Sequence, residues 1–252
     1  LVDDDPAVEA RCFELAGSGR QDVLVSGSIG LAALRAWGAP AQADASIEEL
    51  VAAETARLAQ LERTRDATPV DHLLLSAIVA AWHGDADLAR RAVAAARPHA
   101  AGSGFHSRES ALAIAEAELA LLDGRHDDAG RIITPILANN PPVLAHYVAL
   151  RTAVAAGDPV ALETHARWLL ANRGRGLAEY LYFYAALTAN VAAANDAALI
   201  LADDYLRQGR AADARAVLDP LAAAWARADP ESVPQRRLAA LRQQASLDQE
   251  NE

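Results

Sequence analysis

Reactive side chains in this chain of 252 residues rarely occur in the arrangements that catalysis or metal binding requires. The seven histidines form no His-Glu-x-x-His motif and no pair four residues apart, the spacing that turns two imidazoles to one helix face. His126-Asp127-Asp128 joins an imidazole to two carboxylates, but it closely follows Gly124, where acidic residues suit the solvated start of a helix. The sequence therefore predicts no metal site.

Covalent catalysis and nucleotide binding are also poorly supported. All 23 basic residues are arginine, so the chain has no lysine for a Schiff base or a P-loop. No Gly-x-Ser-x-Gly elbow is present, and the single cysteine, Cys12, can form neither an internal disulfide nor a thiolate metal site. We therefore expect a chain that is not an enzyme, with no catalytic residues and no cofactor.

One stretch near the start permits an alternative. Residues 22–37 contain DVLVS, GSIG and LAALRAW, which could form the strand, glycine loop and helix of a dinucleotide-binding unit. The complete G-x-G-x-x-G fingerprint is absent, however, and no alternating strands follow. The same residues also fit a helix pair that turns at Gly19, and we favour that interpretation.

Composition indicates a helical fold and excludes two classes of partner. Hydrophobic residues make up 52% of the chain, much of it alanine, and aromatic residues only 5%, which suits closely packed helices better than a sheet. The net charge of −11 is spread along the chain and repels phosphate backbones, so we expect no nucleic-acid binding. No apolar run approaches the ~18 residues of a transmembrane helix, so we expect no membrane insertion.

The elements that would position any functional side chain follow a pattern around glycine turns. Around Gly124, small or apolar residues lie seven and four positions before the turn and five, nine and twelve after it: Ala117, Ala120, Ala129, Ile133 and Ile136. The same offsets carry small or apolar residues around Gly84, Gly157 and Gly209, and in degraded form around Gly19. Small residues let two helices approach closely where they cross, while larger ones fill the seam between them.

This pattern resembles the tetratricopeptide (TPR) repeat, in which about 34 residues form one helix–turn–helix unit. The clearest units are Val70–Ser103, Ser110–Val143, Val143–Gly176 and Asn195–Ala228. The resemblance implies an all-α fold, a right-handed α-solenoid of antiparallel helix pairs with about twelve helices, in a single domain over residues 1–252.

Three further segments complete the expected architecture. A helix over 46–63 precedes the first clear unit, and an extra tyrosine-rich helix, Leu177–Val191, follows an interruption at the Arg-Gly residues 173–176. Residues 235–252 are expected to provide a capping helix, Gln235–Ala245, and a frayed acidic tail, because terminal repeats need a polar outer face.

The resemblance implies that the first helix of each unit lines a concave face that binds an extended peptide or a partner helix. On the matching helices, the candidate partner-binding residues are Trp82, Tyr147, Arg151, Asp203 and Arg207, joined by Tyr180 and Tyr184 of the tyrosine-rich helix. Aromatic and arginine side chains commonly anchor interfaces. We expect the partner between the Val143 and Asn195 units, where these charges and tyrosines would converge.

The same face would carry apolar residues: Leu74, Ile78, Ile114, Leu121, Leu199 and Leu206. For Trp82, Leu121 and Leu206 the alternative is that they pack between neighbouring units. Both interpretations remain open at the level of the sequence.

Three functions follow from this architecture. The first is a non-catalytic protein–protein interaction scaffold that holds a peptide or partner domain in a concave groove. The alternatives are a sensor or regulatory module of a larger bacterial transcriptional or signalling regulator, and an oligomerisation platform that forms homo-oligomers. The chain begins at Leu1 and contains no methionine, which indicates a fragment or a processed chain. We expect the protein to lie in the cytoplasm. The truncated or processed start makes the periplasm the alternative.

Overall fold

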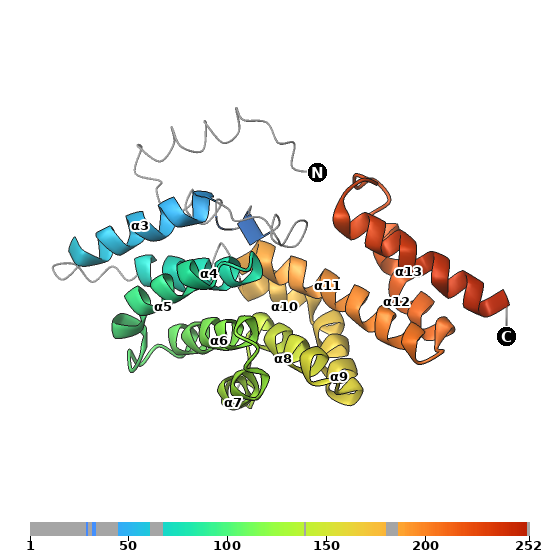
Figure 1. Cartoon of the computed structure of the whole chain (residues 1–252), viewed down its shortest axis with the longest axis horizontal. Coiled ribbons are helices and arrows are strands. Elements are labelled where there is room, and N and C mark those ends of the chain that lie inside the picture. Colours follow the sequence, from blue (N-terminus) through green and yellow to red (C-terminus); the bar gives the residue numbers. More distant parts are fainter. Residues whose placement is uncertain are drawn as a thin grey trace.

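The computed structural model describes residues 29, 32–33, 45–60, 68–138, 140–179 and 186–250, which contain helices and turns but no strand (Figure 1). The prediction of an all-α fold is therefore confirmed for this part of the chain. The eleven helices described are α3 (Ala45–Gln60), α4 (Thr68–Trp82), α5 (Ala86–Ala100), α6 (His106–Leu122), α7 (His126–Leu137), α8 (Val143–Ala156), α9 (Pro159–Ala171), α10 (Arg173–Ala178), α11 (Ala186–Arg207), α12 (Ala211–Ala224) and α13 (Val233–Glu250). The expected pair around Gly19, with Cys12, lies almost wholly outside the described residues.

Four tight turns with the same backbone geometry join α4 to α5, α6 to α7, α8 to α9 and α11 to α12. Their glycines, Gly84, Gly124, Gly157 and Gly209, have φ between 67° and 82°. After each glycine, the next residue donates its N–H to a carbonyl five residues earlier; Arg125, for example, donates to the Ala120 carbonyl at 2.8 Å. Glycine allows this left-handed helix end because it has no Cβ to clash with the carbonyl.

The residues at the repeated offsets form the seam of each helix pair. Around Gly124, Ala117, Ala120, Ala129 and Ile133 are buried, and Ile136 is partly buried against the core. The equivalent residues of the other three pairs are all buried: Ala77, Ala80, Ala89, Val93 and Ala96; Leu150, Ala153, Leu162, Ala166 and Leu169; Ala202, Tyr205, Ala214, Leu218 and Leu221. The pattern found in the sequence is thus a packing pattern.

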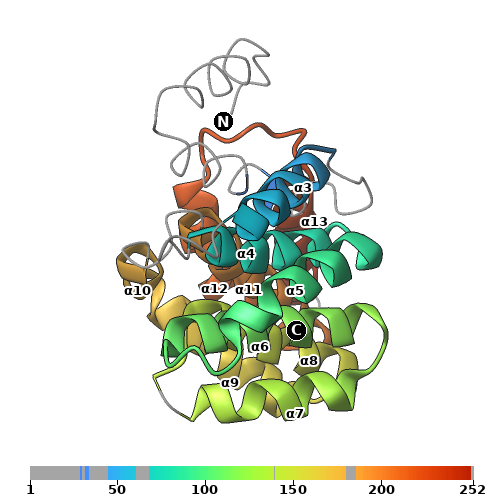
Figure 2. The ribbon, with the colours of Figure 1, turned by 90° about the vertical axis from the view of Figure 1, so that its left-hand side faces the viewer.

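Successive pairs pack against one another in order. Helix α4 contacts α6, α6 contacts α8, and α8 contacts α11, so the first helices of the pairs form a continuous row. Each second helix packs against its own first helix and against the next one. In Figure 1 the helices follow one another from α3 at the left, through α7 at the bottom, to α13 at the right. Figure 2 shows the same succession from the side, with α3 at the top and α7 at the bottom.

The expected end of the tyrosine-rich helix Leu177–Val191 at Val191 is wrong. Residues 186–191 belong to α11, which continues without interruption to Arg207. This stretch is rich in alanine and contains neither glycine nor proline, so nothing in its local sequence ends the helix near Asn195. The first helix of this pair is consequently longer than the others.

The Arg-Gly residues 173–176, expected to interrupt the helices, instead belong to α10. Gly176 is buried, and a Cβ at this position would lie 3.3 Å from the Asn190 Cβ. Its missing side chain lets α10 approach α11. Helix α13 likewise extends to Glu250, through most of the segment expected to be a frayed tail. None of the described helices is long and apolar enough to cross a membrane.

Candidate functional site

Three first helices are joined by a network of buried polar side chains. Glu118 on α6 is 1% exposed, and its two carboxylate oxygens have different partners. The Trp82 indole of α4 donates to Oε1 at 3.0 Å, and the Arg151 guanidinium of α8 forms an ion pair with Oε2. A charge removed from water in this way needs both a counter-ion and hydrogen bonds. Here both come from neighbouring repeats.

The ion pair joins equivalent positions of two consecutive helix pairs. Glu118 lies six residues before Gly124, and Arg151 lies six residues before Gly157. The two positions are therefore equivalent in consecutive units, and the row of first helices places equivalent positions beside one another. Opposite charges at equivalent positions are a sequence signal for this contact.

A second polar link runs from α8 to α11 and α13. Tyr147 donates its hydroxyl to Asp196 at 2.8 Å, and Arg237 donates to the other oxygen of the same carboxylate at 2.8 Å. The edge of one ring in the Trp82–Tyr147 pair meets the face of the other, with 5.5 Å between centroids. The Arg151 guanidinium lies 5.9 Å from the centroid of the Tyr147 ring. Three of the predicted partner-binding residues thus lie together.

The protonation states in this network are fixed by burial and charge. Burial and the nearby Asp196 carboxylate raise the pKa of Tyr147 well above its usual range, so this phenol stays neutral and acts as a donor. Burial acts to lower the pKa of Arg151, but the nearby Glu118 and Asp196 carboxylates outweigh it and raise that pKa. Arg151 therefore stays charged, and Tyr147 neutral, across the physiological range.

The other predicted residues lie elsewhere. Arg207 forms ion pairs with Asp203 at 3.5 Å and Asp204 at 3.4 Å, all on the last turns of α11. Among the described residues, Arg151 pairs with Glu118 and has no ion pair with Asp203. Tyr180 and Tyr184 lie outside the described residues.

Most apolar residues expected on the concave face are in the core. The buried members are Leu74, Ile78, Ile114, Leu199 and Leu206, while Trp82 and Leu121 are partly buried and pack against the core. Leu206 is therefore a core residue and is not available to a partner. Ile78 and Ile114 have an additional role, because both line a cavity.

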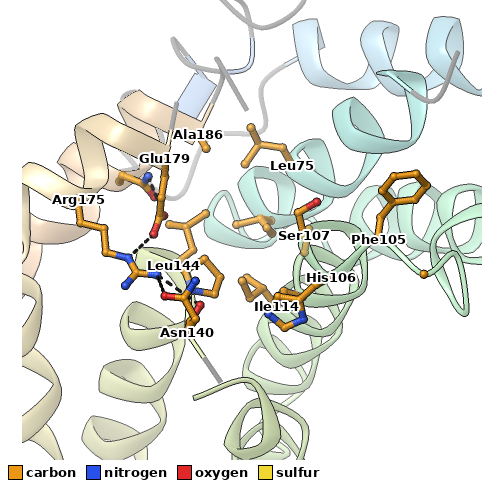
Figure 3. Close-up of a pocket in the computed structure, with 16 residues that line it drawn as sticks. Leu75, Phe105, His106, Ser107, Ile114, Asn140, Leu144, Arg175, Glu179 and Ala186 are labelled. Carbon is orange, nitrogen blue, oxygen red and sulfur yellow. Dashed lines mark hydrogen bonds and ion pairs between the residues drawn. The ribbon is translucent and has the colours of Figure 1, made fainter. Parts of the chain in front are cut away.

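This cavity has a volume of about 430 Å³ and lies among α4, α6, α8, α10 and α11 (Figure 3). Its apolar wall includes Leu75 and Ile78 from α4, Ile114 from α6 and Leu144 from α8. Phe105, which is exposed, lies beside it at the start of α6. Sequence reasoning missed this site because its walls come from four separate units.

One wall of the cavity carries an ion pair. Arg175 donates to Glu179 at 2.8 Å and to the Asn140 side chain at 2.9 Å. The second oxygen of Glu179 accepts the Val143 backbone N–H at 3.0 Å. The carboxylate thus satisfies a free donor at the start of α8, where a negative charge is favourable.

Two buried polar atoms at the cavity have no hydrogen-bond partner among the described residues: Ser110 Oγ and Asn190 Oδ1. Each residue is only 2% exposed. The amide nitrogen of Asn190 is satisfied, since it donates to the Gly176 carbonyl at 3.2 Å. Buried polar atoms are nearly always paired, so two unpaired ones at one cavity are unusual.

His146 of α8 and His165 of α9 form a pair of neighbouring imidazoles. The Nδ1 atoms of His146 and His165 are 3.1 Å apart, and the His146 ring stacks on Trp168 at 3.6 Å. Burial, with the nearby His165 and Arg175, lowers the pKa of His146 to about 4. Burial also lowers the pKa of His165. Both imidazoles are therefore neutral at physiological pH, and one can donate its Nδ1–H to the Nδ1 of the other.

No group of three or more histidine, cysteine, aspartate or glutamate side chains is arranged to hold a metal ion in the part of the chain that the structure describes. The polar network is satisfied by its own members, whereas the cavity offers open space beside apolar side chains. The cavity is therefore the stronger candidate for binding.

Comparison with known proteins adds no relative: no family model, curated protein or solved structure matches this chain.

Proposed function

We propose that the chain is a non-catalytic interaction scaffold, built as a right-handed TPR-like α-solenoid of antiparallel helix pairs, and that its first helices hold a segment of a partner protein. The tight glycine turns and the contacts between successive pairs support this architecture. In this arrangement the row of first helices forms the inner face.

The observation that carries the proposal is the alignment of the cavity with the polar network. Three residues follow one another on one face of each of three helices. They are Leu75, Ile78 and Trp82 on α4; Ser110, Ile114 and Glu118 on α6; and Leu144, Tyr147 and Arg151 on α8. Spacings of three or four residues keep side chains on the same face of a helix. The three helices thus share one surface, apolar near their starts and polar one to two turns later.

Such a surface suits a segment with an apolar anchor and a polar continuation. The anchor would lie near the exposed Phe105, and the polar part would follow the half-buried Trp82 and Arg151. Hot spots of protein interfaces are commonly aromatic or arginine residues in well-packed surroundings.

The test compares two arginines of matched exposure on different helix layers. Arg207 lies on the first helix α11 and Arg167 on the second helix α9; their side chains are 59% and 60% exposed, and each pairs with a carboxylate four residues earlier. We expect Arg207→Glu to reduce partner capture and Arg167→Glu to leave it unchanged. The measurement is affinity purification from the native lysate with quantification by mass spectrometry, with circular dichroism to check helicity.

Equal capture by both variants would place the partner away from the α11 end of the first-helix row. Arg151 is unsuitable for this test, because its removal leaves the Glu118 carboxylate buried without its counter-ion.

The cavity favours a second function, the sensor module of a larger regulator. A cavity of this size with mainly apolar walls and a few polar groups is a feature of small-molecule sites. The partner-capture experiment does not depend on this second function.

A further inference from the structure

We propose that Phe105 is a movable lid of the cavity. Its ring exchanges between the exposed position seen in the structure and a buried position among the apolar side chains of α4, α6 and α8. An apolar ligand, or an apolar side chain of a partner, must then displace the ring to enter. This proposal goes beyond the interaction scaffold and does not depend on it.

Phe105 lies at the mouth of the cavity with most of its side chain in water. It is 59% exposed, although it lines the cavity and directly precedes α6. Figure 3 shows Phe105 at one side and Arg175 and Asn140 at the other, with Leu75 and Ile114 between them. An apolar ring is therefore placed beside an apolar space that it does not fill.

The cavity can receive this ring. Its volume of about 430 Å³ exceeds that of a benzyl group, and apolar contacts come from three helices, through Leu75 and Ile78, Ile114, and Leu144. The charged side chains of the wall do not oppose entry, because Arg175 and Glu179 form an ion pair at 2.8 Å. Burial of the ring is favourable in proportion to the apolar area removed from water.

The loop that carries Phe105 can change its backbone conformation at little cost. Gly102 and Gly104 flank Ser103 with φ of 65° and 73°, and glycine adopts φ of either sign about equally well. The hydrogen bonds next to the ring are exposed: Phe105 N–H donates to Ser103 Oγ at 3.2 Å, and Gly104 N–H donates to the Glu109 carboxylate at 3.3 Å. Water can replace both acceptors when the loop moves.

A cation holds the ring in the exposed position. The Arg108 guanidinium lies 4.8 Å from the ring centroid and also pairs with Asp71 at 2.9 Å. An exposed cation–π contact favours one position by about twofold to fivefold. Burial of a phenylalanine side chain favours the other by about tenfold or more. We therefore expect both positions to be populated, with the buried one favoured about threefold.

Nuclear Overhauser effects in the isotope-labelled full chain test the movement. The ring protons of Phe105 should show effects to the methyl groups of Leu144, which Figure 3 shows beside Asn140, at the side of the cavity opposite Phe105. The variant Ala111→Phe fills the cavity from α6 and should remove these effects.

Binding of N-phenyl-1-naphthylamine, an uncharged apolar dye that fluoresces when removed from water, tests whether the ring competes with a ligand. Phe105→Ala should tighten dye binding about fourfold, because the dye no longer displaces a ring that occupies the cavity for about three quarters of the time. Helix α6 loses no cap in this variant, since the Phe105 side chain makes no capping hydrogen bond. Val160→Ala is the control: Val160 is 75% exposed and does not line the cavity, so dye binding should not change.

Three results would overturn the proposal. The first is the absence of an effect between the Phe105 ring and Leu144 in the unmodified protein. The second is the same effect in Ala111→Phe, and the third is dye binding that Phe105→Ala weakens, leaves unchanged or does not show at all. None of these results affects the comparison of Arg207→Glu with Arg167→Glu, so failure of the two proposals can be distinguished.

Discussion

Replacement of Arg151 by alanine removes the counter-ion of a carboxylate that is 1% exposed, and we expect a large loss of stability. Removal of one partner from a buried ion pair typically costs ~3–5 kcal/mol, whereas an exposed pair contributes ~0–1 kcal/mol. The Arg151 side chain is 31% exposed, and Trp82 still donates to Glu118 after the substitution. We therefore expect the free energy of unfolding to fall by about 2–3 kcal/mol.

Equilibrium unfolding in urea, followed by far-UV circular dichroism, measures this change. Arg167→Ala is the control, because the Arg167 side chain is 60% exposed and its partners, Glu163 at 2.8 Å and the Tyr205 hydroxyl at 3.1 Å, do not include a fully buried carboxylate. Its effect should stay within ~1 kcal/mol. Equal losses for the two variants would refute the conclusion that the Glu118–Arg151 pair is a buried link between repeats.

A double substitution tests the mechanism. Glu118→Leu with Arg151→Leu replaces both charges by apolar side chains of reduced volume, so no carboxylate remains buried alone. Such replacements of buried ion pairs are often neutral or stabilising. The double variant should therefore be more stable than Arg151→Ala, and a loss equal to or greater than that of Arg151→Ala would contradict the argument.

Two further predictions concern pH and the helix turns. Because the His146 pKa is lowered to about 4, the unfolded chain binds a proton between pH 6.5 and 4 that the folded chain does not, so stability is full above pH 6.5 and is lost as pH falls toward 4. His146→Phe should remove on the order of 2–3 kcal/mol of this pH dependence in urea titrations at several pH values, and an unchanged dependence would contradict the assignment. Gly124→Ala should lose about 1–2 kcal/mol, because φ is +73° there although no atom lies within 4 Å of the added Cβ. Gly130→Ala should instead gain about 0.5–1 kcal/mol, since this helical position leaves 3.7 Å to Thr152; the same sign for both in urea unfolding would refute the reasoning.

Local sequence was sufficient to predict the helix pairs. The left-handed turn at Gly124 and the buried alanines on each side depend on residues within about one unit, so their spacing records them directly. The network was partly accessible as well. Glu118 and Arg151 hold equivalent positions in consecutive units, and a regular repeat places such positions side by side.

The segment after α9 could not be predicted in the same way. Gly174 and Gly176 have low helix propensity, which favours a break, yet α10 forms because Gly176 lets it pack closely on Asn190. The break expected before Asn195 came from the repeat length, whereas the local alanine-rich sequence continues the helix. A tertiary contact therefore decided that α10 forms, whereas local helix propensity decided that α11 continues past Asn195.

The sequence by itself determined that the chain is helical and where its turns and seams lie, because these features depend on spacings of a few residues. Only the tertiary structure decided the cavity. Ser110 and Asn190 belong to helices that are far apart in the chain, and neither shows in its local sequence whether its polar atom finds a partner. Hydrogen-bond satisfaction is a property of the packed neighbours, so it is established only when the helices come together.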